Sequence, residues 1–341
     1  MRDFDAGRGV RWLDIGSDAR PGPGRRDRLS PAQIEVIAHT VHRTPEVMVK
    51  VLNRGGQSLG AVTRHLDYLS RKGELEIETD EGERLKGKGA EAELLDDWDL
   101  DLDEKRRTAD LSARGTRNPP KLVQKLMFSM PAGTPPQKVL ASVKNFAREE
   151  FGLKHRYAMV LHTDEPHSHV HLVVKAMGAD GRRLNIRRAT LREWRRQFAR
   201  HLRAEGVAAN ATPRQVRGQI KPPKTDGIYR AALRGASTHH RERAEAVARE
   251  LAAGRVNTEP GKNRLLETRR AVVRGWNEVA DTLLMQGQLE LALAVRRFVG
   301  RMPPPRTENE QIAEKLREVR PATPVRNTEL GQRYDQLSLT R

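Results

Sequence analysis

Residues 157–176 read YAMVLHTDEPHSHVHLVVKA, and this stretch decides the fold. It contains two apolar runs, 157–162 and 169–176, whose length and composition are typical of β-strands. Six residues, including an Asp and a Pro, separate the two runs, which favours an antiparallel hairpin.

The flanking sequence supplies further strands and helices. Short alternating runs predict strands at 47–52, 74–79 and 122–130. Apolar residues that recur every three or four positions predict helices at 58–72, 136–151 and 190–205. In the last helix, Thr190 and Glu193 have the spacing of a capping box. Strands that alternate with helices, with one pair in a hairpin, indicate an α/β fold with an antiparallel sheet.

Composition divides the chain into four parts. Residues 1–45 are rich in Arg, Gly and Pro at first, and we expect an arm with little core of its own and a weak helix near 31–42. Residues 46–208 hold the predicted sheet and form the main domain. Residues 209–302 are expected to be helical, and residues 303–341 to be a disordered tail.

An acidic segment interrupts the main domain. Residues 91–104, EAELLDDWDLDLDE, carry eight acidic side chains and no basic one, which predicts a solvated or mobile insertion. A metal-binding acidic loop is less favoured, because the segment lacks Gly-punctuated ligand spacing.

The chain is strongly basic, with 63 Lys and Arg against 45 Asp and Glu and a net charge of +18. Such an excess favours nucleic acid as a partner, although a basic protein without a specific ligand is the alternative. Cysteine is absent, which excludes disulfides and thiolate metal sites and fits a reducing compartment. No apolar run approaches the roughly 18 residues of a membrane span, and no signal peptide is visible, so we expect a cytoplasmic bacterial protein.

Four of the eleven histidines lie within ten positions of the hairpin. Side chains alternate faces along a strand, so His169 and His171 project to the same side. His162 ends the preceding strand, where the hairpin partner lies opposite them. Three converging imidazoles that leave coordination positions open are typical of a catalytic divalent-metal site. The alternative, histidines on a solvated sheet face, is less favoured for four in ten residues beside a carboxylate.

Asp164 and His167 are candidates for supporting roles. Asp164 is well placed to hold a ligand imidazole by its second nitrogen. His167 is a candidate metal ligand, hydrogen-bond donor or proton carrier, and the sequence does not decide among these roles.

Tyr68 lies away from the apolar side of its predicted helix. On a helical projection it is roughly 130° from the centre of the stripe of residues 59, 62, 66 and 69, and it shares its face with Arg64 and Arg71. A phenol between two guanidinium groups is a reasonable place to meet a phosphodiester. An ordinary exposed aromatic residue is the more common outcome, so the helix alone leaves both interpretations open.

Three segments together resemble a known family. Residues 66–76 read LDYLSRKGELE, residues 128–134 read FSMPAGT, and residues 162–174 read HTDEPHSHVHLVV. The first resembles the nucleophile motif, and the last the metal motif, of the conjugative relaxases typified by the T-DNA border endonuclease. The His-hydrophobe-His core is the signature of the wider HUH endonuclease class. The likeness runs from about residue 47 to 208, with no counterpart beyond.

The resemblance implies a five-stranded antiparallel sheet flanked by helices, with Tyr68 as the nucleophile. It also implies that His162, His169 and His171 bind a divalent metal, for which we expect Mg²⁺ or Mn²⁺. The implied function is a site- and strand-specific relaxase that nicks single-stranded DNA at an origin of transfer and can religate it. Nicking would proceed through a 5′-phosphotyrosyl intermediate and initiate conjugative transfer of a plasmid or integrative element.

Further expectations accompany this function. Asp164 and His167 are the candidate bases for the phenol. DNA contacts are expected from seven basic residues: Arg64, Arg71, Lys72, Arg182, Arg183, Arg187 and Arg188. Accessory relaxosome proteins and a transfer coupling protein are expected partners.

Three rival functions remain at this point. A rolling-circle replication initiator or transposase of the same class would share the chemistry but serve another DNA site. An inert DNA-binding accessory protein would retain the fold, although the intact tyrosine and histidines argue against it. A hydrolase of small phosphoesters would leave the charge and the tyrosine motif without a purpose.

Overall fold

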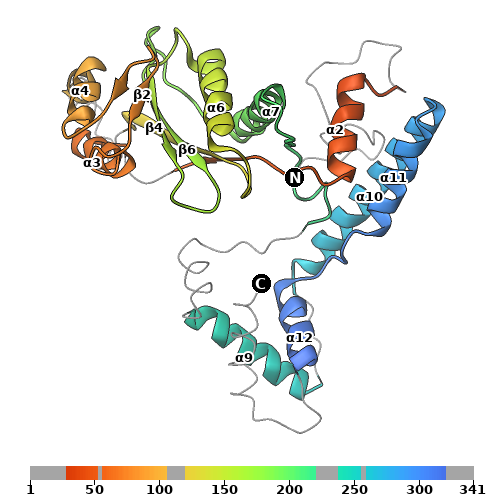
Figure 1. Ribbon diagram of the computed structural model, residues 1–341. Coiled ribbons are helices and arrows are strands. Elements are labelled where there is room, and N and C mark those ends of the chain that lie inside the picture. Colours follow the sequence, from red (N-terminus) through yellow and green to blue (C-terminus); the bar gives the residue numbers. More distant parts are fainter. Residues whose placement is uncertain (1–27, 53–55, 106–119, 220–236, 255–258, 320–341) are drawn as a thin grey trace. The chain divides into compact units, whose positions relative to one another are not determined.

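The computed structural model describes residues 28–52, 56–105, 120–219, 237–254 and 259–319. The chain divides into two compact units (Figure 1). One unit spans His42–Ala211, and the other combines Met1–Val41 with Thr212–Arg341. The main domain expected at 46–208 therefore falls within the first of these.

An antiparallel sheet of six strands organises the first unit. The strands are β1 (Met48–Val51), β2 (Ile77–Thr79), β3 (Arg84–Leu85), β4 (Val123–Ser129), β5 (Tyr157–His162) and β6 (His169–Lys175). Their order in the sheet is β1-β4-β6-β5-β2-β3. The predicted antiparallel α/β fold is confirmed, and the expected count of five strands is one too few. The additional strand, β3, is a two-residue extension that pairs with β2 across a turn at Gly82, too short to leave an alternating pattern.

The β5–β6 hairpin lies near the centre of the sheet, as the sequence predicts. His162 pairs with His169, and Val160 pairs with His171. On the other side of β6, strand β4 places Ser129 opposite His169. Both neighbours of β6 therefore fix its register.

Helices α6 (Pro136–Phe151) and α7 (Arg188–Ala204) cover one face of the sheet (Figure 1). Their core includes Phe146, Trp194 and Phe198, packed on Phe128 of β4. The predicted start of the last helix is wrong by two residues. Arg187 is the N-cap, Thr190 lies in the first turn, and Glu193 pairs with Arg196 at 2.7 Å instead of reaching back to the cap.

Helices α3 (Leu59–Leu69) and α4 (Ala90–Asp97) cover the other face. The expectation that residues 91–104 form a solvated or mobile insertion is wrong for their apolar side chains. Leu94, Trp98 and Leu100 are fully buried in the core beneath α3, while the acidic side chains alternate with them on the outside. The high density of acidic residues made the apolar face of this helix difficult to recognise from the sequence.

The second unit is helical. Helices α2 (Pro31–Val41), α10 (Lys262–Met285) and α11 (Leu289–Gly300) share a core that includes Ile37, Trp276 and Phe298. Helices α9 (Thr238–Ala252) and α12 (Glu308–Val319) form a smaller cluster around Val247 and Ile312.

Two expectations about the ends of the chain need correction. The segment before residue 46 is not an arm without a core, because Leu29 and Ile37 are buried against the C-terminal helices. The tail expected from residue 303 begins instead with α12, whose Leu316 is buried. The remaining parts of both predictions, residues 1–27 and 320–341, lie outside the described residues. Among the described helices, none is both long enough and apolar enough to cross a membrane.

The acidic segment provides a stability test. Leu94→Ala removes a side chain with no exposure and should lower the free energy of unfolding by about 2–5 kcal/mol. Leu102→Ala, in the same segment, removes a side chain that is 41% exposed, and should change it by less than about 1 kcal/mol. Urea unfolding of the two variants measures both values. Equal effects would contradict the packing of α4.

Candidate active site

Three imidazoles converge where the β5–β6 hairpin turns. His162, His169 and His171 are buried, and each offers a ring nitrogen within 4.8 Å of the others. Their ring centroids are 4.8–5.1 Å apart. The structure thus brings together the three histidines that the sequence singled out.

The pairing of the strands explains this convergence. His162 and His169 face each other across the hairpin, and His171 lies two residues further along the same side of β6. That side is the one covered by α3 and α4, because Val160 and Val173 of the same face belong to their core. The cluster therefore occupies the end of the α3-covered face.

Hydrogen bonds orient two of the three rings. Nε2 of His162 donates to the Leu69 carbonyl at 2.8 Å, and Nδ1 of His169 donates to the His167 carbonyl at 3.3 Å. A backbone carbonyl can only accept, so the opposite nitrogen of each ring keeps its lone pair. Nδ1 of His171 is buried and has no hydrogen-bond partner among the described residues.

Burial favours the neutral form of two of these rings, His171 and His162. Burial, reinforced by the neighbouring His162 and His169, lowers the pKa of His171 to about 3. Burial also lowers the pKa of His162. Neutral imidazole is the form that binds a metal, and three such rings match a divalent cation of the borderline or transition type. Of the two implied ions, the residues present therefore fit Mn²⁺ better than the hard cation Mg²⁺, and the ion would be held by His162, His169 and His171.

Tyr68 lies in the last turn of α3. The side chain of Ser58 caps the start of this helix, and Val62, Leu66 and Leu69 are buried beneath it. Tyr68 points away from that stripe and is 62% exposed, as the helical projection predicts. The helix ends at Ser70.

The backbone after α3 adopts an uncommon conformation. Arg71, Lys72 and Gly73 have φ angles of 53°, 59° and 89°. Left-handed conformations of two consecutive residues other than glycine are strained and tend to occur at functional sites. This turn brings the Arg71 side chain back toward the histidine cluster.

Arg71 connects the tyrosine to that cluster. Its guanidinium carbon lies 5.1 Å from the centre of the Tyr68 ring. Its Nη2 lies 2.5 Å from the Asp164 carboxylate and 3.4 Å from Nδ1 of His162. The neighbouring Tyr68 phenol and the hydrogen bond to the Asp164 carboxylate raise the pKa of Arg71, which stays a cation.

The loop residues differ in detail from the expectation. Asp164 was expected to hold a ligand imidazole directly, but its carboxylate binds Arg71, which in turn contacts His162. The Arg71 hydrogen bond lowers the pKa of Asp164. His167 pairs with Glu165 at 3.1 Å on the exposed loop, and its ring centroid is 6.1 Å from that of His169.

Sequence reasoning missed His65 and Lys125. His65, on α3, lies edge-on to His171 with ring centroids 6.5 Å apart, and burial followed by the Lys125 charge lowers its pKa to about 4. Lys125, on β4, is only 6% exposed. The spacing of His65 three residues before Tyr68, on the same side of the helix, was the signal that could have revealed it.

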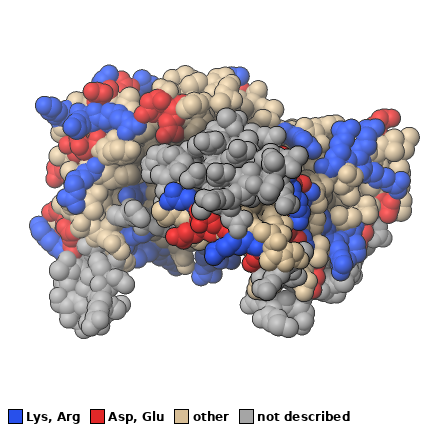
Figure 2. Space-filling view, turned by 90° about the horizontal axis from the view of Figure 1, so that it is seen from below, with Lys and Arg blue, Asp and Glu red and all other residues tan. Residues whose placement is uncertain are grey.

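The basic residues predicted to bind DNA fall into two groups. Arg64, Arg71 and Lys72 lie on or just after α3, beside the cluster. The other four, Arg182, Arg183, Arg187 and Arg188, come later in the chain, after the end of β6 that is opposite to the cluster. Over the face seen in Figure 2, Lys and Arg are interspersed with Asp and Glu rather than gathered in one patch. The DNA-binding role of each remains a prediction.

Comparison with known proteins agrees with this geometry. Residues 68–207 match the family described as relaxase, MobA/VirD2-like, nuclease domain. This part of the chain is similar to relaxase nuclease domains. The resemblance inferred from the tyrosine and histidine motifs is confirmed, and the match begins at Tyr68 itself.

Curated proteins similar to this chain include T-DNA border endonucleases VirD2. The protein of Agrobacterium fabrum is 26% identical over 200 residues, 54% of this chain and 43% of the relative. That of Rhizobium radiobacter is 26% identical over 208 residues, 54% and 46% of the two chains. That of Rhizobium rhizogenes is 26% identical over 206 residues, 56% and 46%. The matches thus cover less than half the length of each relative.

Buried neutral histidines should make stability depend on pH. In the unfolded chain His65 and His171 bind a proton near pH 6.5, whereas in the folded protein they stay neutral down to about pH 4 and about pH 3. The unfolded state binds more protons across this window. The free energy of unfolding should therefore fall as pH drops from 6.5 to 4, by up to about 1.4 kcal/mol per pH unit for each group.

Urea unfolding in the presence of EDTA measures this dependence without interference from metal. His65→Asn should reduce the slope of the free energy of unfolding against pH, whereas His167→Asn, on the exposed loop, should leave this slope unchanged. Equal slopes for His65→Asn and the wild type would show that the folded His65 is not held neutral.

Proposed function

We propose that this protein is a metal-dependent relaxase that nicks single-stranded DNA at an origin of transfer and rejoins it, with Tyr68 as the nucleophile. The observation that carries the proposal is the Arg71 bridge, which joins the exposed phenol of Tyr68 to His162 and Asp164. The match of residues 68–207 to relaxase nuclease domains supports the same reaction.

The attacking group must lose a proton. A phenol with a pKa near 10 is ionised in only about one molecule in a thousand at pH 7, which costs roughly 4 kcal/mol. The Arg71 guanidinium carbon lies 5.1 Å from the centre of the Tyr68 ring, so a positive charge stands beside the attacking residue. Asp164 and His167 are the proposed proton acceptors. The Arg71 ion pair weakens Asp164 in this role, because it lowers the pKa of the carboxyl.

The three histidines would hold a divalent cation, Mg²⁺ or Mn²⁺, which when bound supplies Lewis-acid stabilisation of the negative charge on the scissile phosphate. The protein supplies the remaining elements. The Leu69 and His167 carbonyls orient two imidazoles so that Nδ1 of His162 and Nε2 of His169 carry the lone pairs, and Arg71 approaches the first of these at 3.4 Å. Arg71 is the second positive charge beside the scissile phosphate.

The proposed reaction is a balanced exchange of phosphate esters. The Tyr68 oxygen forms a bond to phosphorus as its proton passes to the base, and the bond from phosphorus to the 3′ oxygen breaks. The released 3′ oxygen takes up a proton, and the 5′-phosphate stays on Tyr68. Because one ester bond replaces another, the 3′-hydroxyl can attack the phosphotyrosine and restore the strand.

The biological setting is part of the same proposal. The strand would belong to a plasmid or integrative element being mobilised in the bacterial cytoplasm. Accessory relaxosome proteins and a transfer coupling protein are the proposed partners. The residues expected to contact DNA are those beside the cluster, Arg64 and Lys72, and the four that follow β6.

Replacement of the nucleophile gives the most direct test. With Mn²⁺ and a pool of single-stranded oligonucleotides, the wild-type protein should form an adduct that persists on a denaturing gel. Tyr68→Phe removes only the phenolic oxygen from an exposed side chain, so it should abolish the adduct while DNA binding persists. Peptide mapping of the adduct identifies the attached residue. An undiminished adduct in Tyr68→Phe would assign the nucleophile elsewhere.

The role of Arg71 can be separated from simple DNA binding. Arg71→Ala removes the bridge and should lower the rate of adduct formation at saturating DNA on the order of 10²-fold, because small misplacements of a reacting group have effects of that size. Arg64→Ala, on the exposed face of α3, should weaken DNA binding while the saturated rate stays close to that of the wild type. Equal saturated rates for Arg71→Ala and the wild type would remove the bridge from the mechanism.

A further inference from the structure

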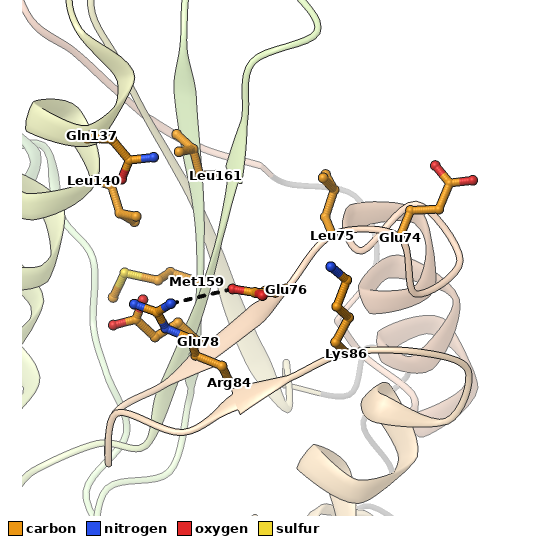
Figure 3. A pocket seen from close by; sticks show the side chains of 10 residues that line it. All are labelled: Glu74, Leu75, Glu76, Glu78, Arg84, Lys86, Gln137, Leu140, Met159 and Leu161. Carbon is orange, nitrogen blue, oxygen red and sulfur yellow. Dashed lines mark ion pairs between the residues drawn. The ribbon is translucent and has the colours of Figure 1, made fainter.

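A cavity of about 310 Å³ lies beside the active site, on the other face of the sheet (Figure 3). Strand β2 pairs with β5 only at Ala158 and Met159. Beyond this point the chain of Leu75 and Glu76 diverges from Leu161, and the cavity occupies the space between them. It has the size at the lower end of small-molecule sites.

The cavity has an apolar floor and polar walls. Leu75, Leu140, Met159 and Leu161 supply the apolar surface, of which Met159 is itself a buried core residue. Glu76, Lys86 and Gln137 supply hydrogen-bond acceptors and donors. An apolar surface with acceptors and donors at its rim is how proteins hold an unstacked nucleobase and read its Watson–Crick edge.

Some of the polar groups are committed to one another and some are free to bind. Glu78 forms an ion pair with Lys144 at 2.6 Å. Glu76 lies 3.8 Å from Arg84, a loose pair between exposed side chains. Lys86 and Gln137 have no side-chain partner in the part of the chain that the structure describes. Two donors and one loosely held carboxylate are therefore available to a ligand.

The charge of the lining favours a base over a phosphate. Three glutamates line the cavity against one Arg and one Lys, and acidic side chains repel a phosphodiester. A neutral base that presents both donor and acceptor groups meets no such barrier. The phosphates of the same strand would remain outside, near the basic residues that follow α3.

The cavity and the histidine cluster share the end of strand β5, since Leu161 lines the cavity and His162 belongs to the cluster. Leu161 is the residue before His162, so their Cα atoms are about 3.8 Å apart, although the side chains lie on opposite faces of the sheet. The backbone amide of Leu75 donates to the Ser70 carbonyl at 2.7 Å, which ties the cavity wall to the turn that carries Arg71.

We infer that this cavity binds one unstacked nucleobase of the nicked strand, within a few nucleotides of the scissile phosphate, and so contributes to the choice of nick site. The inference rests on the proposed function, because the ligand is a base of the same DNA. Glu76 would accept from amino or N–H groups of the base, and Lys86 and Gln137 would donate to its ring nitrogens or carbonyl oxygens.

A coupling experiment tests the inference. Oligonucleotides recovered as covalent adducts of the wild-type full-length protein from a randomised single-stranded pool identify its preferred sequence. A series with one abasic site at each position near the nick is then compared for the rate of adduct formation. One position within a few nucleotides of the nick should show a loss of about tenfold, the loss expected from a single base contact.

The cavity variant combines Glu76→Gln with Lys86→Ala and so lacks two of the groups proposed to hydrogen-bond with the base. In this variant, the abasic site at that one position should no longer lower the rate of adduct formation. A matched control, Glu83→Gln combined with Lys88→Ala, changes an exposed Glu and Lys of the same region outside the cavity. This control should show the same rate loss at that abasic position as the wild type. If the cavity variant responds to every abasic site as the wild type does, no base binds there.

Failure of the proposed function is distinguishable from failure of this inference. Absence of any wild-type adduct would reject the nicking function. Binding of the pool to the Tyr68→Phe protein, followed by sequencing of the bound strands, still reports the base preference. Loss of preference at one position in the cavity variant supports the cavity, and an unchanged preference at all positions overturns it.

Discussion

The pairing of β5 with β6 is the constraint on which the site depends. A shift of one residue would move His169 and His171 to the other face of the sheet, because side chains alternate along a strand. The intervening Val170, Leu172 and Val174 prevent such a shift, since all three are buried under α6 and α7. The apolar core thus fixes the position of the polar site.

The end of α3 depends on the same arrangement. The Leu69 carbonyl, left free as the helix terminates, accepts a hydrogen bond from the His162 ring. A helix end and a strand end therefore satisfy each other's polar groups, and the residues that flank Leu69 are held beside the imidazoles. Tyr68 precedes this contact, and Arg71 follows it.

Much of this architecture was predictable from local sequence. Periodicity identified the strands around the hairpin and the helices α3 and α6, and the strict alternation around His169 predicted the convergence of the histidines. The features that the sequence did not predict depend on contacts between residues distant in sequence, or lie in very short segments. Strand β3 is two residues long, Trp98 is buried despite its acidic neighbours, and Lys125 approaches His65 only through the fold. The cavity beside Leu161 forms where two segments of the chain diverge, and no local sequence pattern predicts such a divergence.

The helical unit is assembled from segments that precede and follow the sheet-containing unit in sequence. The Leu29 backbone exchanges hydrogen bonds with the Gln286 side chain across 257 positions of sequence, and Ile37 is buried among residues of α10 and α11. Closing so long a loop is entropically costly until the intervening segment has become compact. During translation, α2 leaves the ribosome long before its partners exist. The order of folding is thereby set: the sheet can form first, and the helical unit must wait for α11 to be synthesised.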